Sequence, residues 1–446
     1  MGSDPINLRR VIKLTRYQWM VFFAAWLGWG FDVFDGLLFN YVAPNAVPTL
    51  LGLTLGTPEA KSATLQWNGI LTSLFLLGWA AGGVLFGPIC DRFGRRRVLM
   101  ITMVLYALGT AACAFVTDMW QLVACRLIAS LGIGGEWAAG SAMVAEVVPE
   151  ESRVEAGALL YTSAPFGLFL ATWINAEVAG DWFHHDPANS WRYVLMFGLL
   201  PAAIAFVVRL FVKEPEKWAS AASTAPPARL REIFQPALFA RTRSGLIVAI
   251  IALIAWWSCN AFIPVVATAM AQAEALTRDL DKGATNTLVE HWKMIATTAF
   301  NVGGLLGTLL TIYFAKRFGR RTMYKVYFAA ATVSLFATFG FAIPPEVRLY
   351  LYFFIGLTVF GIFGSFTFYL PELFPTRLRS TGAGFCYNIG RVIAAVGVFA
   401  VGAVASAGKG DPGIVFHVLF MIGFVPLIGL LFMRWVIETR GQKMPD

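Results

Sequence analysis

The chain has 446 residues, of which 58% are hydrophobic and 14% are charged, whereas soluble domains average about 25% charged residues. A chain this apolar has too few polar residues to cover the surface of a soluble fold. A membrane protein does not need them, because its outer surface faces lipid. The composition therefore excludes an ordinary soluble protein. The net charge of +9 would suit nucleic-acid binding, unless the basic residues follow a membrane topology.

The chain begins with a basic segment, 1–16, which contains four lysines and arginines. The apolar run after it is too long for a typical signal peptide and lacks a small-residue cleavage pattern, so we predict no cleaved leader. Twelve runs then have the roughly 20 mainly apolar residues that a membrane-spanning helix needs. These predicted spans are 17–42, 67–89, 98–117, 120–147, 154–180, 192–212, 245–270, 290–315, 324–343, 347–371, 381–407 and 413–435.

Lysine and arginine residues are sorted between alternate loops. If the N-terminus is cytoplasmic, the cytoplasmic segments contain 25 of the 35 basic residues and the outer loops contain six. Basic loops resist translocation across the membrane, so this asymmetry places both termini in the cytoplasm. Topology explains the positive charge, and we expect no nucleic-acid partner.

Two motifs recur at nearly one offset, which indicates an internal repeat. Phe-Gly-Arg-Arg occurs at 93–96 and again at 318–321, a shift of 225 residues. Glu-x-x-Pro-x-x-x-Arg occurs at 146–153 and again at 372–379, a shift of 226 residues. Between the copies, 213–244 is rich in alanine, serine, proline and charge. Two parallel repeats of six spans would place a substrate site near mid-membrane, between the halves.

We therefore divide the chain into five parts, each with its own expected place. The two bundles are separated by a linker, and a short tail stands at each end. The parts are a cytoplasmic N-terminal tail (1–16), an N-terminal six-helix bundle (17–212), a cytoplasmic linker (213–244), a C-terminal six-helix bundle (245–435) and a cytoplasmic C-terminal tail (436–446).

Several motifs resemble those of the major facilitator superfamily. The segment 87–97, Gly-Pro-Ile-Cys-Asp-Arg-Phe-Gly-Arg-Arg-Arg, resembles the signature between its second and third helices. The segment 126–137 resembles its fourth-helix signature, and its Gly-Gly-Glu-Trp ending is similar to the sialate and lactate proton symporters. Asp-Val-Phe-Asp at 32–35 is similar to the first helix of the aromatic-acid proton symporters. The second half departs from the loop signature, because Lys316 stands where the first half has Asp91.

The resemblance covers nearly the whole chain. It implies an all-α membrane protein of twelve transmembrane helices, arranged as two six-helix pseudo-symmetric bundles that transport by alternating access. We expect a multi-pass protein of a plasma membrane, and the compact loops are typical of a bacterial inner membrane. We expect it to act as a monomer, surrounded by membrane lipid, without a cofactor.

Acidic residues within the spans are candidates for proton coupling, because charges inside a bilayer are costly and usually functional. Asp32 and Asp35 share one helix face, and two carboxylates so close do not both ionise easily in a low dielectric. The alternative is a permanent ion pair between helices. The resemblance to proton-coupled sugar porters implies that Asp35 and Arg126 form a switch, although they could form a static salt bridge. Glu136 is a second proton site or a structural hydrogen-bonding residue.

A buried arginine is the candidate anchor for an anionic substrate. The guanidinium of Arg391 offers a fork of donors that fits a carboxylate, and Tyr387 and Asn388 share its helix face. A protein carboxylate such as Glu136 could bind Arg391 instead. The predicted substrate site is completed by polar residues of the seventh and eighth spans, which could equally make interhelical hydrogen bonds: Asn260 and Asn301.

Charged residues cluster at the predicted cytoplasmic ends of the helices. The resemblance implies an ion-pair network that closes the inner side and exchanges partners as the bundles rock. The alternative, topology alone, accounts for the arginines but not for the two aligned glutamates. The predicted gate consists of Asp91, Arg92, Arg95, Glu146, Arg153, Arg317, Arg320, Glu372 and Arg379.

No catalytic motif is present: the sequence lacks G-x-S-x-G, H-E-x-x-H and G-x-x-x-x-G-K-[ST]. We therefore expect no enzyme. His-His-Asp at 184–186 is read as an exposed turn, not as a metal site. The leading hypothesis is proton-coupled symport of a small organic anion, a monocarboxylate such as lactate or pyruvate. The alternatives are a sugar or sialic acid proton symporter, an organic cation porter and a non-transporting membrane receptor.

Overall fold

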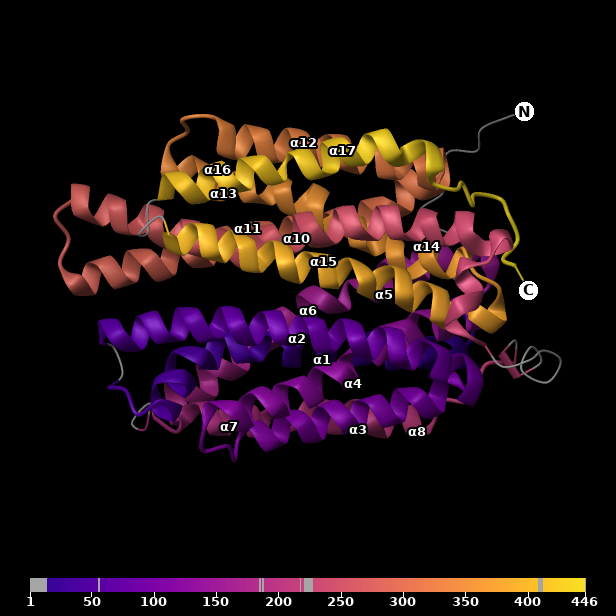
Figure 1. Ribbon diagram of the computed structural model, residues 1–446, viewed down its shortest axis with the longest axis horizontal. Helices are drawn as coiled ribbons and strands as arrows, with labels where there is room; N and C mark the ends of the chain where they lie inside the picture. Colours follow the sequence, from indigo (N-terminus) through magenta and orange to yellow (C-terminus); the bar gives the residue numbers. More distant parts are fainter. Residues whose placement is uncertain are drawn as a thin grey trace.

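The computed structural model describes residues 14–54, 57–183, 186, 188–216, 218–219, 228–407 and 412–445. Every regular element among these residues is a helix (Figure 1). The first half contains α1 (Arg16–Leu50), α2 (Pro58–Phe93), α3 (Arg95–Cys113), α4 (Met119–Val147), α5 (Arg153–Tyr161), α6 (Ser163–Asn175), α7 (Ser190–Phe197) and α8 (Leu199–Leu210). The second half contains α10 (Pro236–Thr277), α11 (Lys282–Phe318), α12 (Arg320–Gly340), α13 (Pro345–Ile355), α14 (Phe366–Glu372), α15 (Arg379–Ala407), α16 (Pro412–Ile422) and α17 (Phe424–Phe432).

Consecutive short helices continue one another as single spans. This joins α5 with α6, α7 with α8, α13 with α14 and α16 with α17; a π turn (Gly356–Phe360) and a 3₁₀ turn (Gly361–Ser365) connect α13 to α14. Within the described ranges, nine segments are long and apolar enough to cross a membrane. The other three expected spans correspond to α7–α8, which is interrupted at Gly198, and to α12 and α15, which have 21 and 29 residues.

The two halves of the chain form two bundles. In Figure 1, α1 to α8 occupy the lower part of the molecule and α10 to α17 the upper part. The long helices α2 and α15 lie side by side at the boundary, where they make many contacts. The predicted all-α fold, with twelve segments in two bundles, is confirmed.

Some helices are longer than the hydropathy of the sequence predicts. α10 has 42 residues and α11 has 37, so each is more than 50 Å long at about 1.5 Å per residue. A bilayer core is only about 30 Å thick, and both helices project beyond their neighbours at one end (Figure 1). At the other end, α10 begins at Pro236, inside the predicted linker, because proline is well suited to the first turn of a helix.

The repeated Phe-Gly-Arg-Arg motif forms the same corner twice. Gly94 joins α2 to α3 with a φ of 107°, and Gly319 joins α11 to α12 with a φ of 90°. Both angles favour glycine, because other residues meet a steric penalty there. Each following helix is capped by a glutamate: Glu214 accepts from the backbone N–H of Arg95 at 2.8 Å, and Glu438 accepts from that of Arg320 at 2.9 Å.

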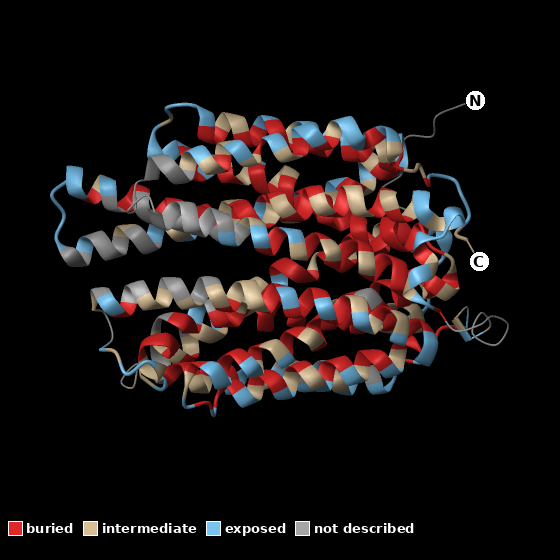
Figure 2. Cartoon of the chain, viewed as in Figure 1, coloured by how far each residue is buried: buried red, intermediate tan, exposed pale blue. Residues whose placement is uncertain are grey.

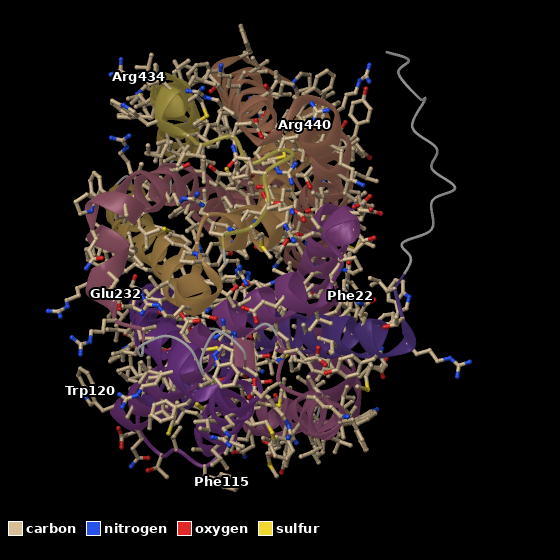
Figure 3. The ribbon with its side chains drawn as sticks, turned by 90° about the vertical axis from the view of Figure 1, so that its right-hand side faces the viewer. Phe22, Phe115, Trp120, Glu232, Arg434 and Arg440 are labelled. Atoms are coloured by element: carbon tan, nitrogen blue, oxygen red, sulfur yellow. The ribbon has the colours of Figure 1, made fainter. Side chains whose placement is uncertain are left out.

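We call the end of the molecule that carries 228–235 and the segment 433–445 the linker end. It is the right-hand end in Figure 1, and Figure 3 looks onto it, with Glu232 and Arg440 labelled. Buried residues are densest in the half of the molecule nearest this end (Figure 2). Hydrogen bonds between the bundles concentrate there, among them Thr367 Oγ1 to the carbonyl of Gly157 at 2.6 Å. The bundles are therefore closed against each other at the linker end.

Candidate substrate and proton sites

Arg391 lies fully buried between the two bundles, halfway along α15. Its guanidinium carbon is 4.0 Å from the ring centre of Trp79 in α2 and 4.3 Å from that of Tyr387. It donates a hydrogen bond to the side-chain carbonyl of Asn388 and interacts electrostatically with Asp32. The cation therefore contacts two aromatic rings and a side-chain amide.

Five tryptophans form a run of ring contacts that reaches Arg391 through Trp79, and we call them the indole cage: Trp29 of α1, Trp79 of α2, Trp137 of α4, and Trp256 and Trp257 of α10. Each has a buried Nε1–H that finds no acceptor among the described residues. A buried indole N–H normally has a partner, because leaving it unpaired costs free energy. The cage thus offers five donors, from both bundles, for acceptors that a ligand would bring.

Tyrosine side chains complete the contact between the bundles at this level. Tyr387 stacks on Trp137 with ring centres 4.1 Å apart, and its hydroxyl lies 3.2 Å from that of Tyr161. Asn388 donates to the carbonyl of Gly384 at 2.8 Å and packs so closely on Gly83 of α2 that no side chain would fit there. The predicted trio on α15 therefore does come together, and it faces the N-terminal bundle.

The other predicted substrate residues lie on the two longest helices of the C-terminal bundle. Asn260 is one turn beyond Trp256 on α10, and Asn301 follows Phe300 on α11. Both are half-buried, and neither makes a hydrogen bond with the described residues. Their part in a substrate site therefore stays a prediction.

Asp35 and Arg126 approach each other, but not as a tight salt bridge. Arg126 Nη1 is 4.0 Å from Asp35 Oδ1, at the limit of an ion pair, and both side chains are buried. Arg126 donates instead to the backbone carbonyls of Asp35, at 3.5 Å, and Gly36, at 3.1 Å. The direct partner of the carboxylate is Thr110 of α3, whose hydroxyl donates to Asp35 Oδ2 at 2.8 Å.

Glu136 belongs to a separate small cavity. It is buried in α4, ten residues nearer the linker end than Arg126, and lines a small pocket together with Trp29, Ser141 and Thr367. Because Thr367 comes from α14, the cavity lies where the two bundles meet. Trp29 belongs both to the lining of this pocket and to the indole cage, so the pocket adjoins the cage.

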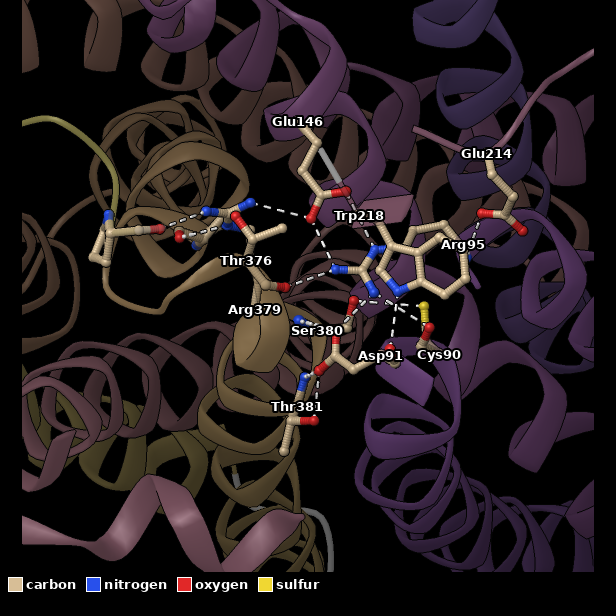
Figure 4. Close-up of polar contacts among 12 residues, drawn as sticks. Cys90, Asp91, Arg95, Glu146, Glu214, Trp218, Thr376, Arg379, Ser380 and Thr381 are labelled. Carbon is tan, nitrogen blue, oxygen red and sulfur yellow. Dashed lines mark hydrogen bonds and ion pairs between the residues drawn. The ribbon is translucent and has the colours of Figure 1, made fainter. Parts of the chain in front are cut away.

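Four of the predicted gate residues form one buried cluster, which we call the gate cluster: Asp91, Arg95, Glu146 and Arg379 (Figure 4). Arg95 lies 2.8 Å from both Asp91 and Glu146, and Arg379 of the C-terminal bundle lies 3.1 Å from Glu146. Such pairs are held in low dielectric and have most of their hydrogen bonds satisfied.

Asp91 also binds the C-terminal bundle directly. It accepts from the backbone N–H of Thr381 at 2.7 Å and from its hydroxyl at 2.6 Å. These donors sit at the first turn of α15, where backbone N–H groups are otherwise unpaired and favour an anion. The gate cluster therefore fastens α2 and α4 to the start of α15.

The ion pair of the second half that is equivalent to Arg95–Glu146 stays within the C-terminal bundle. Arg320 lies 2.8 Å from Glu372, within the C-terminal bundle, and Thr439 donates to the same glutamate at 2.6 Å. Arg153 lies 3.8 Å from the neighbouring Glu150. Two predicted gate residues are exposed and make no ion pair with any described residue: Arg92 and Arg317. Because Lys316 replaces the aspartate of the first half, it instead pairs with Glu155 across the bundles.

Three residues at these sites escaped the sequence analysis. Thr110 carries no charge, and Glu214 and Trp218 lie in the predicted linker. Trp218 donates to the backbone carbonyl of Asp91 at 2.9 Å and lies over Arg95, 5.8 Å from its guanidinium (Figure 4). A signal was present for Glu214, because Glu438 follows it by 224 residues, close to the repeat offset.

Two helical bundles of membrane-spanning length, which meet around buried charged residues, are typical of a membrane transporter. The chain belongs to the Major Facilitator Superfamily, whose sequence pattern matches residues 19–398. The expectations of a transporter and not an enzyme, and of a multi-pass membrane protein, are thereby confirmed.

Individual relatives agree with this assignment. The chain is 29% identical to a probable 4-methylmuconolactone transporter of Cupriavidus pinatubonensis, over 87% of this chain and 84% of that protein. It is 25% identical to a sialic acid transporter of Escherichia coli, over 82% of each. The solved structure of the proton:xylose symporter XylE, bound to 6-bromo-6-deoxy-D-glucose, has the same fold, with a TM-score of 0.74, 18% identity and coverage of 96% of this chain and 98% of that one.

Proposed function

We propose that this protein carries out proton-coupled symport of a small organic anion, a monocarboxylate that also bears a ring or other planar group. The observation that carries the proposal is a buried guanidinium, Arg391, that lies over the ring of Trp79, beside five buried indole N–H groups that find no acceptor among the described residues. A carboxylate supplies both the charge and the acceptors that such a site lacks. The indole faces suit a flat apolar body.

The relatives support the same chemistry. Sialic acid and muconolactones each combine one carboxylate with an oxygen-containing ring, and the transporters named for them are 25% and 29% identical to this chain. Lactate and pyruvate are smaller members of the same class, with a carboxylate but no ring. Asp35, which is buried and hydrogen-bonded by Thr110, is the proposed proton carrier, with Asp32 and Glu136 as further proton sites.

The proposed topology puts the linker end in the cytoplasm, since the basic segments collect there. The chain would then divide into tails, bundles and linker at the boundaries given above and work as a monomer. In this arrangement the gate cluster closes the cytoplasmic side, and opening it would release the substrate inward.

Uptake into proteoliposomes tests the proposal. Labelled sialic acid, benzoate, lactate, pyruvate and xylose are offered with and without an inward proton gradient. We expect carboxylates to accumulate only with the gradient, and benzoate to compete better than lactate for entry. Gradient-driven uptake of xylose alone would overturn the substrate class and favour the sugar-porter alternative. Ligand binding without any uptake would favour a receptor, and uptake of an organic cation in place of these anions would favour the cation porter.

A matched pair of arginine variants locates the anion site. Arg391→Lys keeps a positive charge but removes the fork of donors, so we expect at least a tenfold rise in KM, about 1.4 kcal/mol of binding free energy. Arg348→Lys is the control, because Arg348 is also buried in the C-terminal bundle and also lies over a ring, 4.1 Å from the centre of Phe416. Equal effects of the two changes would remove Arg391 from the substrate site.

A further inference from the structure

The Asp35 carboxylate has an unusual set of partners for a proton-carrying group. It is 3% exposed, and its Oδ1 atom receives no hydrogen bond from the described residues. Its Oδ2 atom receives one, from the hydroxyl of Thr110, at 2.8 Å. Thr110 is itself 2% exposed, so the hydrogen bond is shielded from water on α3. The hydroxyl of a neutral residue, and not the nearby guanidinium, therefore makes the close contact.

Arg126 is held in place independently of the carboxylate. Its guanidinium donates to two backbone carbonyls of α1 and lies over the rings of Phe75, at 4.5 Å, and Phe39, at 5.4 Å. Neither the carbonyls nor the rings change charge when Asp35 gains a proton. Protonation of Asp35 would therefore leave Arg126 anchored, unlike the release expected for a simple salt-bridge switch.

We propose that Thr110 positions the transported proton on Asp35, by reversing the direction of a single hydrogen bond as the carboxyl group is loaded and emptied. This rests on the proton-coupled symport proposed above. An ionised carboxylate only accepts hydrogen bonds, whereas a protonated one can donate, and a threonine hydroxyl can do both. Thr110 can therefore stay bonded to Asp35 in either state, so the proton stays in one place without a compensating movement of Arg126.

Other titratable groups share this pocket and limit how the pH dependence is read. Arg126 faces Asp35 from α4, and the Cys113 thiol faces both from α3, one turn beyond Thr110. Cys125 of α4 lies against Cys113. Asp32 is one turn away on α1 itself. None of these groups is removed when Thr110 is changed, so a shift in the pH profile reports the lost hydroxyl.

The test compares valine variants of two threonines on the same helix. Thr110→Val keeps the shape and removes the hydroxyl. Thr102→Val is the control, because Thr102 is also fully buried but donates only to carbonyls of its own helix, at 3.0 and 3.2 Å. Uptake of labelled substrate is measured against external pH for each variant. Thr110→Ser, which keeps a hydroxyl, should behave like the wild type.

The bond from Thr110 to the ionised carboxylate is charge-assisted and therefore stronger than its bond to the protonated carboxyl group, so losing the hydroxyl favours the protonated form of Asp35. We expect Thr110→Val to move the pH of half-maximal uptake upward by about one unit, and Thr102→Val and Thr110→Ser to leave it in place. If the Thr110→Val protein does not accumulate in the membrane, Thr110→Cys replaces it. A thiol is a weaker hydrogen-bond donor of similar size, so we expect the pH of half-maximal uptake to move upward in this variant too.

Two results separate this inference from the proposed function. If wild-type uptake does not respond to a proton gradient, the symport proposal itself fails. If the wild type responds, but Thr110→Val or Thr110→Cys has the wild-type pH midpoint, symport stands and the role of Thr110 is overturned. A midpoint that moves equally in Thr102→Val would also overturn it, because the shift would then reflect packing in α3 and not the bond to Asp35.

Discussion

At the scale of single residues, the candidate sites are built from unpaired donors and loosely paired charges. Buried arginines usually meet carboxylates, and buried indole N–H groups usually meet acceptors. Here Arg391 is held by rings and an amide, and the indole cage is unpaired among the described residues. The proposed substrate carboxylate would supply the acceptor that these donors lack.

This difference between paired and unpaired indoles can be measured. Trp137→Phe removes an N–H without a described partner, whereas Trp191→Phe removes one that donates to the carbonyl of Ala188 at 2.7 Å. We expect Trp137→Phe to weaken substrate binding several-fold with little loss of thermal stability. Trp191→Phe should lower stability by about 1 kcal/mol and leave affinity intact. Scanning fluorimetry with and without substrate checks both, and loss of stability alone in Trp137→Phe would count against the cage.

At the scale of elements, the two halves repeat a corner in which a glutamate from the end of each bundle caps a helix. Glu214 accepts backbone hydrogen bonds from Arg95, Arg96 and Arg97 at 2.8 to 3.3 Å, so it covers nearly the whole first turn of α3. Glu438 caps α12 in the same way, because it accepts backbone hydrogen bonds from Arg320 at 2.9 Å and Arg321 at 3.1 Å. A carboxylate at a helix N-terminus pairs otherwise unsatisfied N–H groups and complements the helix dipole.

Removing these caps should weaken each bundle locally. Glu214→Gln keeps the size but loses the charge, so we expect a stability loss of about 1 kcal/mol, and Glu438→Gln should lose a similar amount. Glu216→Gln is the control, because Glu216 lies two residues away and is exposed. Thermal unfolding in detergent checks the three proteins. Equal melting temperatures for Glu214→Gln and Glu216→Gln would contradict the capping role.

At the scale of the whole molecule, the contacts between bundles are unevenly distributed. The described hydrogen bonds and ion pairs between bundles gather at the linker end, where Asp91 binds the start of α15 and Glu146 binds Arg379. Buried ion pairs add little net stability but are costly to break singly. They are therefore suited to hold one of two packings until the charges find other partners.

The buried thiol of Cys90 reports on the closure of the linker end. Cys90 lies in the interface, 3.5 Å from the hydroxyl of Ser380, whereas Cys386 is buried within the C-terminal bundle. Glu146→Gln removes the charge that joins Arg95 to Arg379, so the bundles should part more often, and labelling of Cys90 by a membrane-permeant thiol reagent should speed up several-fold. Cys386 should stay unlabelled, and the exposed Glu150→Gln should change nothing. Uniform labelling of both thiols would indicate unfolding in place of gate opening.

The linker contributes a contact whose carboxylate stays ionised near neutral pH. Arg377 donates to the Glu232 carboxylate, and this hydrogen bond lowers the pKa of Glu232 from its ordinary 4.5. A lowered pKa means that the contact contributes stability above pH 4.5 and loses it only as the pH falls through the folded-state pKa. We therefore expect Glu232→Gln to leave the pH profile of uptake between pH 5.5 and 8 unchanged. A shifted profile would place part of the pH response in the linker.

The sequence by itself determined the membrane-spanning class, the twelve segments and the repeat, because hydropathy and charge sorting act locally along the chain. It also singled out Asp35, Arg126, Arg391 and the gate arginines, since charges inside apolar runs stand out. The tertiary structure decided their partners. Which carboxylate meets which arginine depends on helix packing, so neither the looseness of the Asp35–Arg126 pair nor the contact of Thr110 could be foreseen from a single sequence.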